Sequence, residues 1–266
     1  SANGRLMCHY CGHSEPAYER CPQCGGIMKH IGTGTQKVEE ELHALFPGAK
    51  VLRMDTDTVG ASHGHEKLLR QFEEEKIPIL LGTQMVAKGL DFENVTLVGV
   101  LCADASLYID NYRAPERTFS LLSQVVGRAG RGSKQGRAII QTFTPENEVI
   151  RAAAAQDYDA FYESEIRMRR LRRYPPFADL FSFTVTGADE SRVIRAAKAL
   201  RDALGYAVER REELKPLSIE VLGPAGASVV KVNNRYRYRV FLVGKGCPAL
   251  RRLVAEYLYA FYQHKE

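Results

Sequence analysis

The chain has 266 residues, of which 45% are hydrophobic, and its formal net charge at pH 7 is only +5. This length suits one large domain or two ordinary ones with real cores, and the mild positive charge favours an anionic partner without requiring one. No apolar run reaches the roughly 20 residues that span a bilayer, and no signal peptide is present, so we expect a cytoplasmic rather than a membrane or secreted protein.

Four of the six cysteines lie in the first 24 residues, as two C-x-x-C pairs. Thiolates are soft ligands, and each short turn places two sulfurs on one side of a tetrahedral zinc ion. Without a secretory signal, such pairs indicate metal ligation in a reducing compartment rather than disulfides. Because the chain begins inside this stretch, we expect it to be part of a longer protein. The other two cysteines, Cys102 and Cys247, are expected to be inert packing residues. The spacing predicts a closed structural zinc site formed by Cys8, Cys11, Cys21 and Cys24.

From residue 27 to residue 144, short apolar runs alternate with amphipathic stretches. Alternation of this kind predicts a parallel α/β sheet with right-handed helical crossovers. We expect strands at 27–31, 50–54, 78–82, 95–103 and 137–143, and helices at 36–46, 65–75 and 113–127.

Gly34 and Thr35 stand directly before the first of these helices. A helix N-terminus with free backbone N–H groups and a hydroxyl suits a phosphate, so we predict that both residues bind a nucleic-acid backbone. An ordinary capped helix start is the alternative.

The segment from Leu81 to Phe92 follows an expected strand and resembles motif V of superfamily 2 helicases, T-x4-[KR]-G-[LI]-D. In that family the threonine end faces the nucleic-acid backbone and the aspartate end faces the nucleotide ribose. The alternative to a binding role is an ordinary surface loop between a strand and a helix. The resemblance assigns Thr83 and Lys88 to DNA, and Gly89 and Asp91 to the nucleotide.

The segment Gln124–Arg131 holds two arginines among glycines, at the end of an expected helix. Arginine presents a planar fork of donors that matches phosphate oxygens, so Arg128 and Arg131 are candidate arginine fingers for ATP. Gln124 is expected to orient the segment. A solvated basic loop and an RNA-contacting turn are the alternatives. The chain has no G-x-x-x-x-G-K-[ST] and no strand ending in a paired Asp-Glu for magnesium, so it is expected to complete an ATP site that it does not build alone.

Residues 147–173 show one long helical pattern, which the prolines after Tyr174 stop. The last part of the chain then changes character. A strand at 180–186, a helix at 190–212, a strand near 218–222, a hairpin through 228–243 that turns at Asn233-Asn234, and a helix at 248–262 predict a small α+β domain of split βαβ type.

Arginine and tyrosine alternate from Arg235 to Arg239, and in a strand they point to opposite faces. The arginine face is either simply solvated or a surface for a DNA backbone or an acidic tail.

The zinc pairs, Gly32-Thr33-Gly34-Thr35, the motif V segment, Gln124–Arg131 and Tyr174-Pro175-Pro176-Phe177 together resemble the PriA family of bacterial primosomal replication-restart helicases. The resemblance runs through the whole chain. It implies an ATP-dependent 3′→5′ DNA helicase with Zn²⁺, and with ATP and Mg²⁺ bound mainly by an absent first lobe. It also implies branched and single-stranded DNA, other primosome proteins and single-strand-binding protein as partners.

The implied domains are a partial zinc-binding element (1–26), a RecA-like second helicase lobe with its trailing helix (27–174) and the C-terminal α+β domain (175–266). One departure concerns the metal, because the family carries eight cysteines that hold two zincs with interleaved pairing. The spacing here indicates one site, whereas the resemblance indicates halves of two. Two functional alternatives stay open: the second lobe of another superfamily 2 helicase acting on RNA, and a non-enzymatic module that binds DNA and partner proteins.

Overall fold

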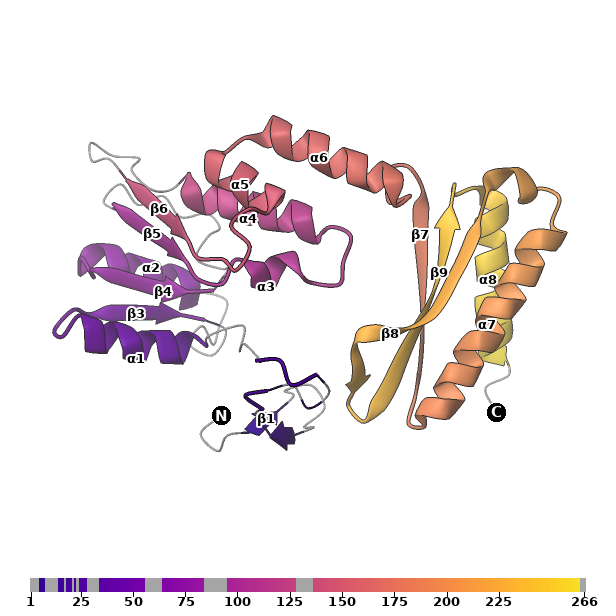
Figure 1. Cartoon of the computed structure of the whole chain (residues 1–266), viewed down its shortest axis with the longest axis horizontal. Helices are drawn as coiled ribbons and strands as arrows, with labels where there is room; N and C mark the ends of the chain where they lie inside the picture. The colour runs from indigo at the N-terminus through magenta and orange to yellow at the C-terminus, as the bar shows by residue number, and fades with distance from the viewer. Residues whose placement is uncertain are drawn as a thin grey trace. The chain divides into compact units, whose positions relative to one another are not determined.

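The computed structural model of the chain describes residues 5–7, 14–16, 18–20, 22, 24–27, 34–55, 64–83, 95–127 and 136–263 (Figure 1). These residues fall into two compact units, one within 29–165 and the other comprising 166–266 together with 1–28. Within the described ranges, no helix combines the length and the hydrophobicity needed to cross a bilayer.

The 29–165 unit is built from parallel strand pairs joined by helices. Its elements are α1 (Thr35–Leu45), β3 (Val51–Met54), α2 (Gly64–Glu74), β4 (Ile79–Gly82), β5 (Leu97–Val100), α3 (Asp104–Leu107), α4 (Ala114–Val126), β6 (Arg137–Ile140), α5 (Glu148–Ala155) and the start of α6 (Tyr158–Leu171). Strand β3 pairs in parallel with β4, and β5 with β6. Because parallel neighbours need a crossover connection, α2 and α4 each carry the chain back to the start of the next strand. The predicted parallel α/β arrangement is confirmed for these strands.

Three expectations for this unit need correction, the first being the strand expected at 137–143, which ends at Ile140. Strand β5 ends at Val100, earlier than predicted, because Cys102 adopts a positive φ of 57° and α3 begins at Asp104. The single long helix expected over 147–173 is wrong, since Gln156 has a φ of 55° and separates α5 from α6. The Asp157 carboxylate then accepts the Ala160 N–H at 2.9 Å and caps the new helix. Most of the strand expected at 27–31 lies outside the described residues.

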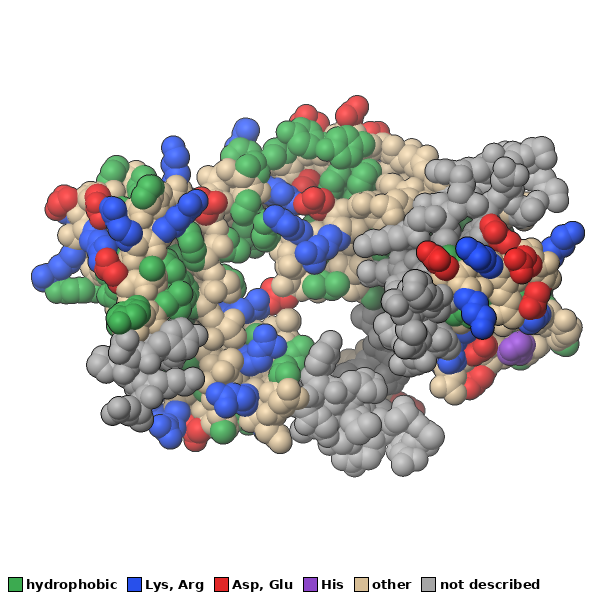
Figure 2. Space-filling model, turned by 180° about the vertical axis from the view of Figure 1, so that it is seen from behind, with side chains coloured by type: hydrophobic (Ala, Val, Ile, Leu, Met, Phe, Trp, Pro, Cys, Tyr) green, Lys and Arg blue, Asp and Glu red, His purple; other side chains and the backbone are tan. Residues whose placement is uncertain are grey.

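The core of this unit lies between one face of the β5–β6 pair and helices α3 to α6. Phe119 of α4 and Phe161 of α6 are buried and stack, with ring centroids 4.2 Å apart and an interplanar angle of 11°. Tyr158 and Tyr162 lie on the same face of α6 as Phe161, and the Tyr158 ring is 6.1 Å from that of Phe119. Tyr158 is 60% exposed and Tyr162 is 47% exposed, and hydrophobic side chains gather over this helix in Figure 2. The buried residues of this hydrophobic core are Ala103, Leu107, Phe119, Leu122, Ile150, Ala152, Ala153 and Phe161.

A buried carboxylate ties α3 to the chain that leaves β6. Asp104 is only 1% exposed, and its oxygens accept the Phe143 N–H at 2.9 Å and the hydroxyls of Thr142 at 3.0 Å and Thr144 at 2.8 Å. Burial raises the pKa of this carboxyl, but the hydrogen bonds from Phe143, Thr144 and Thr142 together outweigh it, and the pKa lies below its ordinary value. The charged form of Asp104 therefore holds the β6–α5 connection against the start of α3.

The C-terminal part of the second unit is a three-stranded antiparallel sheet with two helices. Its elements are β7 (Asp179–Gly187), α7 (Glu190–Arg210), a 3₁₀ turn η2 (Lys215–Leu217), β8 (Glu220–Val232), β9 (Arg235–Gly244) and α8 (Pro248–Gln263). The sheet order is β7-β9-β8, so β9 lies between the two strands that α7 connects. The core includes Leu204 of α7, Val240 and Leu242 of β9, and Leu253 of α8. The expected first strand, both helices and the hairpin are present. The strand expected near 218–222 is not separate from the hairpin: it is the first part of β8, whose register with β9 shifts after Leu222 and again after Gly226.

The β8–β9 hairpin turns at the predicted residues. Val232 pairs with Arg235, and Asn233 and Asn234 between them have φ values of 48° and 57°. A two-residue turn with positive φ at both positions matches the right-handed twist of the flanking strands, and asparagine tolerates that conformation.

In the N-terminal part, β1 (Arg5–Met7) pairs with β2 (Ser14–Pro16) in an antiparallel ladder, and Arg20 forms a bridge with Ile27. These residues show no strand period in the sequence, so the pairing was not predicted.

Candidate nucleotide and nucleic-acid site

The carboxyl ends of β3 and β4 bring two of the predicted DNA-binding positions to one edge of the sheet. Met54 lies opposite Gly82 in the parallel register, so Asp55 and Thr83, which follow them, leave the sheet at the same edge. The Thr35 hydroxyl, at the start of α1, donates to the Asp55 carboxylate at 2.6 Å. In parallel α/β sheets, ligands bind beyond this edge.

Asp55 is a residue that sequence reasoning missed. It is 6% exposed and forms an ion pair with Arg53, whose Nε lies 3.1 Å from the Asp55 carboxylate. The Arg53 guanidinium also pairs with Glu39 of α1 at 2.8 Å. This chain of contacts fixes the first turn of α1 against β3. The available signal was a carboxylate placed directly after a strand that ends at the ligand-binding edge.

The N-terminus of α1 has the form expected for an anion-binding helix start. Gly34 occupies the N-cap position in an extended conformation (φ −61°, ψ 146°). No atom would lie within 4 Å of a Cβ at this position, so the space beside Gly34 is open. Thr35 is half-buried and Gly34 is exposed. The assignment of Gly34, Thr35 and Thr83 to DNA stays a prediction. If Thr35 binds DNA, either its backbone N–H contacts the phosphate or its hydroxyl gives up the hydrogen bond to Asp55 and donates to the phosphate instead.

Gln124 lies on the exposed last turn of α4, one turn before the predicted arginines. Its amide donates to the Ser120 hydroxyl at 3.4 Å, and α4 ends where the Gly127 N–H donates to the Ser123 carbonyl at 3.0 Å. Phe119 and Leu122 bury the opposite side of the helix, which sets its rotation. Arg128 and Arg131 lie outside the described residues, as do Lys88, Gly89 and Asp91.

The metal prediction rests almost entirely outside the described part of the chain. Cys24 is exposed and not in a disulfide, whereas Cys8, Cys11 and Cys21 are beyond the described residues. Among the residues that are described, no group of three or more His, Cys, Asp or Glu side chains could hold a metal ion. The zinc site therefore stays a prediction.

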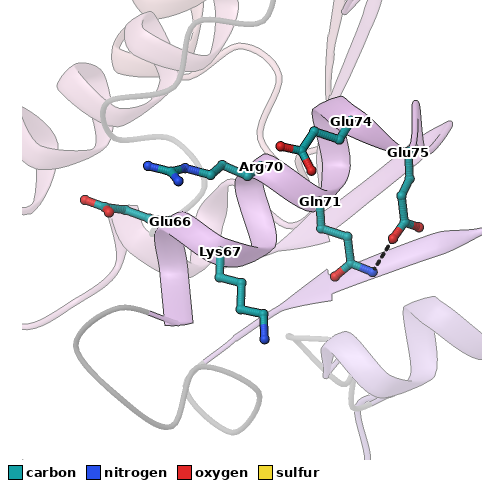
Figure 3. Close-up of a pocket in the computed structure, with 6 residues that line it drawn as sticks. All are labelled: Glu66, Lys67, Arg70, Gln71, Glu74 and Glu75. Atoms are coloured by element: carbon teal, nitrogen blue, oxygen red, sulfur yellow. Dashed lines mark hydrogen bonds between the residues drawn. The ribbon is translucent and has the colours of Figure 1, made fainter.

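A shallow hollow runs along α2, but its chemistry does not suit a nucleotide. Figure 3 shows that long charged side chains line it, and the Gln71 amide donates to Glu75 at 3.0 Å. Lys50 also pairs with Glu75 and, with Gln71, holds the pKa of that carboxyl below its ordinary value. None of the predicted site residues lines this hollow, whose walls are Glu66, Lys67, Arg70, Gln71, Glu74 and Glu75.

The basic strand of the C-terminal unit alternates as predicted. The Tyr238 hydroxyl donates to Glu190 of α7 at 2.8 Å, so the tyrosine points toward the helices. This contact raises the pKa of Tyr238. Arg239 lies opposite Thr184 of β7, and its guanidinium stands 5.4 Å from the centre of the Phe241 ring. The face away from the helices therefore combines arginine forks with threonine hydroxyls, a combination that suits phosphate oxygens.

Comparisons with known proteins agree with this geometry. The helicase conserved C-terminal domain matches residues 31–133, and the primosomal protein N C-terminal domain matches residues 170–265. The first match coincides with the parallel α/β unit and fits a RecA-like lobe.

Among curated proteins, the replication restart protein PriA of Bacillus subtilis is 44% identical over 255 residues, which are 96% of this chain and 31% of that protein. The PriA of Synechocystis is 40% identical (89% of this chain, 28% of the relative), and that of Treponema pallidum is 38% identical (97% and 38%). The chain thus spans about a third of the length of the curated relatives that it matches. With both of its units matched, the chain belongs to the family of PriA replication restart proteins.

Proposed function

We propose that this chain supplies the second lobe and the C-terminal domain of an ATP-dependent DNA helicase of replication restart. The observation that carries the proposal is the parallel α/β unit, which matches a helicase C-terminal domain and has its α4 helix leading directly into the arginine segment. The proposed domains are 1–26, 27–174 and 175–266, the last of split βαβ type. The proposed polarity is 3′→5′, and the proposed location is the cytoplasm.

ATP would lie mainly on a first lobe that this chain does not include. Arg128 and Arg131 would reach its terminal phosphates, where phosphoryl transfer spreads negative charge over the equatorial oxygens. Gln124 would orient the segment, and Gly89 with Asp91 would contact the ribose. Mg²⁺ would neutralise charge between the phosphates when bound. Because the arginines act only on a nucleotide held by the other lobe, closure of the two lobes and hydrolysis would be coupled.

DNA would bind along the carboxyl edge of β3 and β4. Gly34, Thr35, Thr83 and Lys88 would grip one strand through its phosphates, so that movement of this lobe would shift the grip along the backbone. Backbone N–H groups and hydroxyls at this edge are sequence-independent donors, as a translocating enzyme needs. Branched and single-stranded DNA, other primosome proteins and single-strand-binding protein are the proposed partners.

The cysteine pairs would hold structural zinc. Four thiolates complete one tetrahedral site, so metal analysis of the chain should give zinc to protein ratios of zero or one, and a ratio of two would contradict the ligand count.

The chain by itself is expected to show no DNA-stimulated ATP hydrolysis, because no phosphate-binding loop is present in its sequence. Adding the first lobe, in trans or in the same polypeptide, should restore turnover. The measurement is phosphate release with and without single-stranded DNA. Turnover by this chain alone that disappears in Arg128→Ala would overturn the proposal of a shared site, and failure of the first lobe to restore any turnover would favour a non-enzymatic binding module.

A further inference from the structure

The chain turns sharply between α5 and α6 at a residue that is not glycine. Gln156 has a φ of 55°, in the left-handed region that residues other than glycine and asparagine rarely adopt. Its N–H donates to the Ala153 carbonyl at 3.1 Å, and the next N–H, of Asp157, donates to Ala152 at 2.9 Å, which closes α5. A glutamine held in this conformation needs surroundings that fix it there.

The side chain of Gln156 caps the end of α4. Its Nε2 donates to the Ser123 carbonyl at 3.3 Å, across 33 positions of sequence. Ser123 lies in the last turn of α4, where the chain is about to leave the helix. The Gly127 N–H donates to the same carbonyl at 3.0 Å, so two donors converge on it.

Gly127 leaves the space that the Gln156 amide occupies. A Cβ at position 127 would lie 2.8 Å from the Gln156 Nε2 and 3.2 Å from the Ser123 carbonyl oxygen. The φ of Gly127 is −68°, which any residue adopts, so a larger residue here would conflict with the Gln156 amide and not with the backbone conformation. A side chain at this position would push the amide away from α4.

The α5–α6 corner contacts α4 at a second point. Phe161, one turn into α6, stacks on Phe119 with a centroid separation of 4.2 Å. Helices α4 and α5 also pack side by side (Figure 1). The corner is therefore a fixed support, and the Gln156 amide extends from it to the last turn of α4.

We infer that Gln156 is a positioning residue that fixes the direction in which the chain leaves α4 toward Arg128. This inference rests on the proposed function, in which the arginines that follow Gly127 contact ATP. A displacement of a catalytic group by about 1 Å can lower a rate by about 10²-fold. A contact with the last turn of α4, five residues before Arg128, is therefore expected to affect turnover rather than nucleotide affinity.

The test uses the complete protein that contains this chain. Gln156→Gly removes the amide but favours the positive φ, so the fold is preserved while the cap is lost. We expect kcat for DNA-stimulated ATP hydrolysis to fall about tenfold, KM for ATP to stay within about twofold, and the thermal midpoint to be unchanged or higher. Gln156→Lys, which retains a long donor for the Ser123 carbonyl, should keep most of the wild-type kcat. Gln71→Ala on α2 removes another glutamine amide that donates a side-chain hydrogen bond, and it serves as the control.

A double-mutant cycle separates positioning from simple destabilisation. Gly127→Ala displaces the same amide, so the loss in Gly127→Ala/Gln156→Gly should not exceed the larger single loss. If the two single-variant reductions in kcat multiply in the double variant, or if kcat is unchanged in Gln156→Gly, this inference is overturned. If Arg128→Ala abolishes turnover while Gln156→Gly does not lower it, only the positioning role fails. If Arg128→Ala retains full turnover, the proposed function itself fails.

Discussion

Replacing Arg128 by alanine in the complete protein is expected to lower kcat for DNA-stimulated ATP hydrolysis by about 10³-fold or more, with a much smaller change in KM for ATP. An arginine finger stabilises charge that develops on the transferring phosphoryl group, and this stabilisation is largest in the transition state. Arg128 and Arg131 stand three residues apart. Arg131→Ala should therefore give a loss of the same kind.

Two controls distinguish this role from a general effect of positive charge. Arg128→Lys keeps the charge but not the planar fork, so it should remain strongly impaired. Arg117→Ala removes an exposed arginine from the same α4 helix and should leave kcat near the wild-type value. Steady-state phosphate release over a range of ATP concentrations measures both constants. Full turnover in both Arg128→Ala and Arg131→Ala would exclude these residues as fingers.

The second large effect concerns Asp104, whose replacement by alanine is expected to destabilise the 29–165 unit by about 3 kcal/mol. Three donors, from Phe143, Thr142 and Thr144, would lose the carboxylate that satisfies them in a buried place. Asp104→Asn keeps the shape but loses the charge, so its cost should be smaller. Hydrogen exchange of the Phe143 amide and urea unfolding followed by circular dichroism measure the change. Glu146→Ala, an exposed carboxylate in the same connection, is the control.

The same carboxylate makes the stability of this unit depend on pH. Its pKa is lowered in the folded chain, so the unfolded chain takes up its proton first as the pH falls. The stabilisation from Asp104 should thus be complete above the unfolded pKa of about 3.9 and be lost as the pH falls through the lower folded pKa. Asp104→Asn should remove this part of the acid sensitivity. An unchanged pH dependence in Asp104→Asn would show that other groups control it.

Local patterns predicted the regular elements well where one face of an element is buried. The expected helix at 36–46 and strands at 50–54 and 78–82 lie within one or two residues of α1, β3 and β4. Apolar spacing along a helix or strand is a property of neighbouring residues, so the sequence displays it directly. The Asn233-Asn234 turn was predictable for the same reason, because its backbone conformation is a preference of those two residues.

The break at Gln156 was not predictable in this way. Ala152 to Ala155 favour a helix, and an aspartate such as Asp157 caps a helix only where the backbone leaves the helical conformation, which the local pattern does not show. The left-handed conformation of Gln156 is instead held by its contact with Ser123 and by the stacking of Phe161 on Phe119. Ser123 and Phe119 both belong to α4, which is distant in sequence. Intrinsic helix propensity is a weak preference that tertiary packing overrides.

By itself, the sequence determined the local patterns from which the function is proposed: the parallel α/β pattern, the cysteine pairs, the threonine and glycine segments after strands and the two arginines beyond α4. Only the tertiary structure decided which side chains meet: Thr35 with Asp55 at the edge of the sheet, Asp104 with the chain after β6, and Gln156 with the end of α4. The reason is physical. A motif is a local string, whereas a hydrogen bond across 20 to 40 residues depends on how the strands and helices pack together.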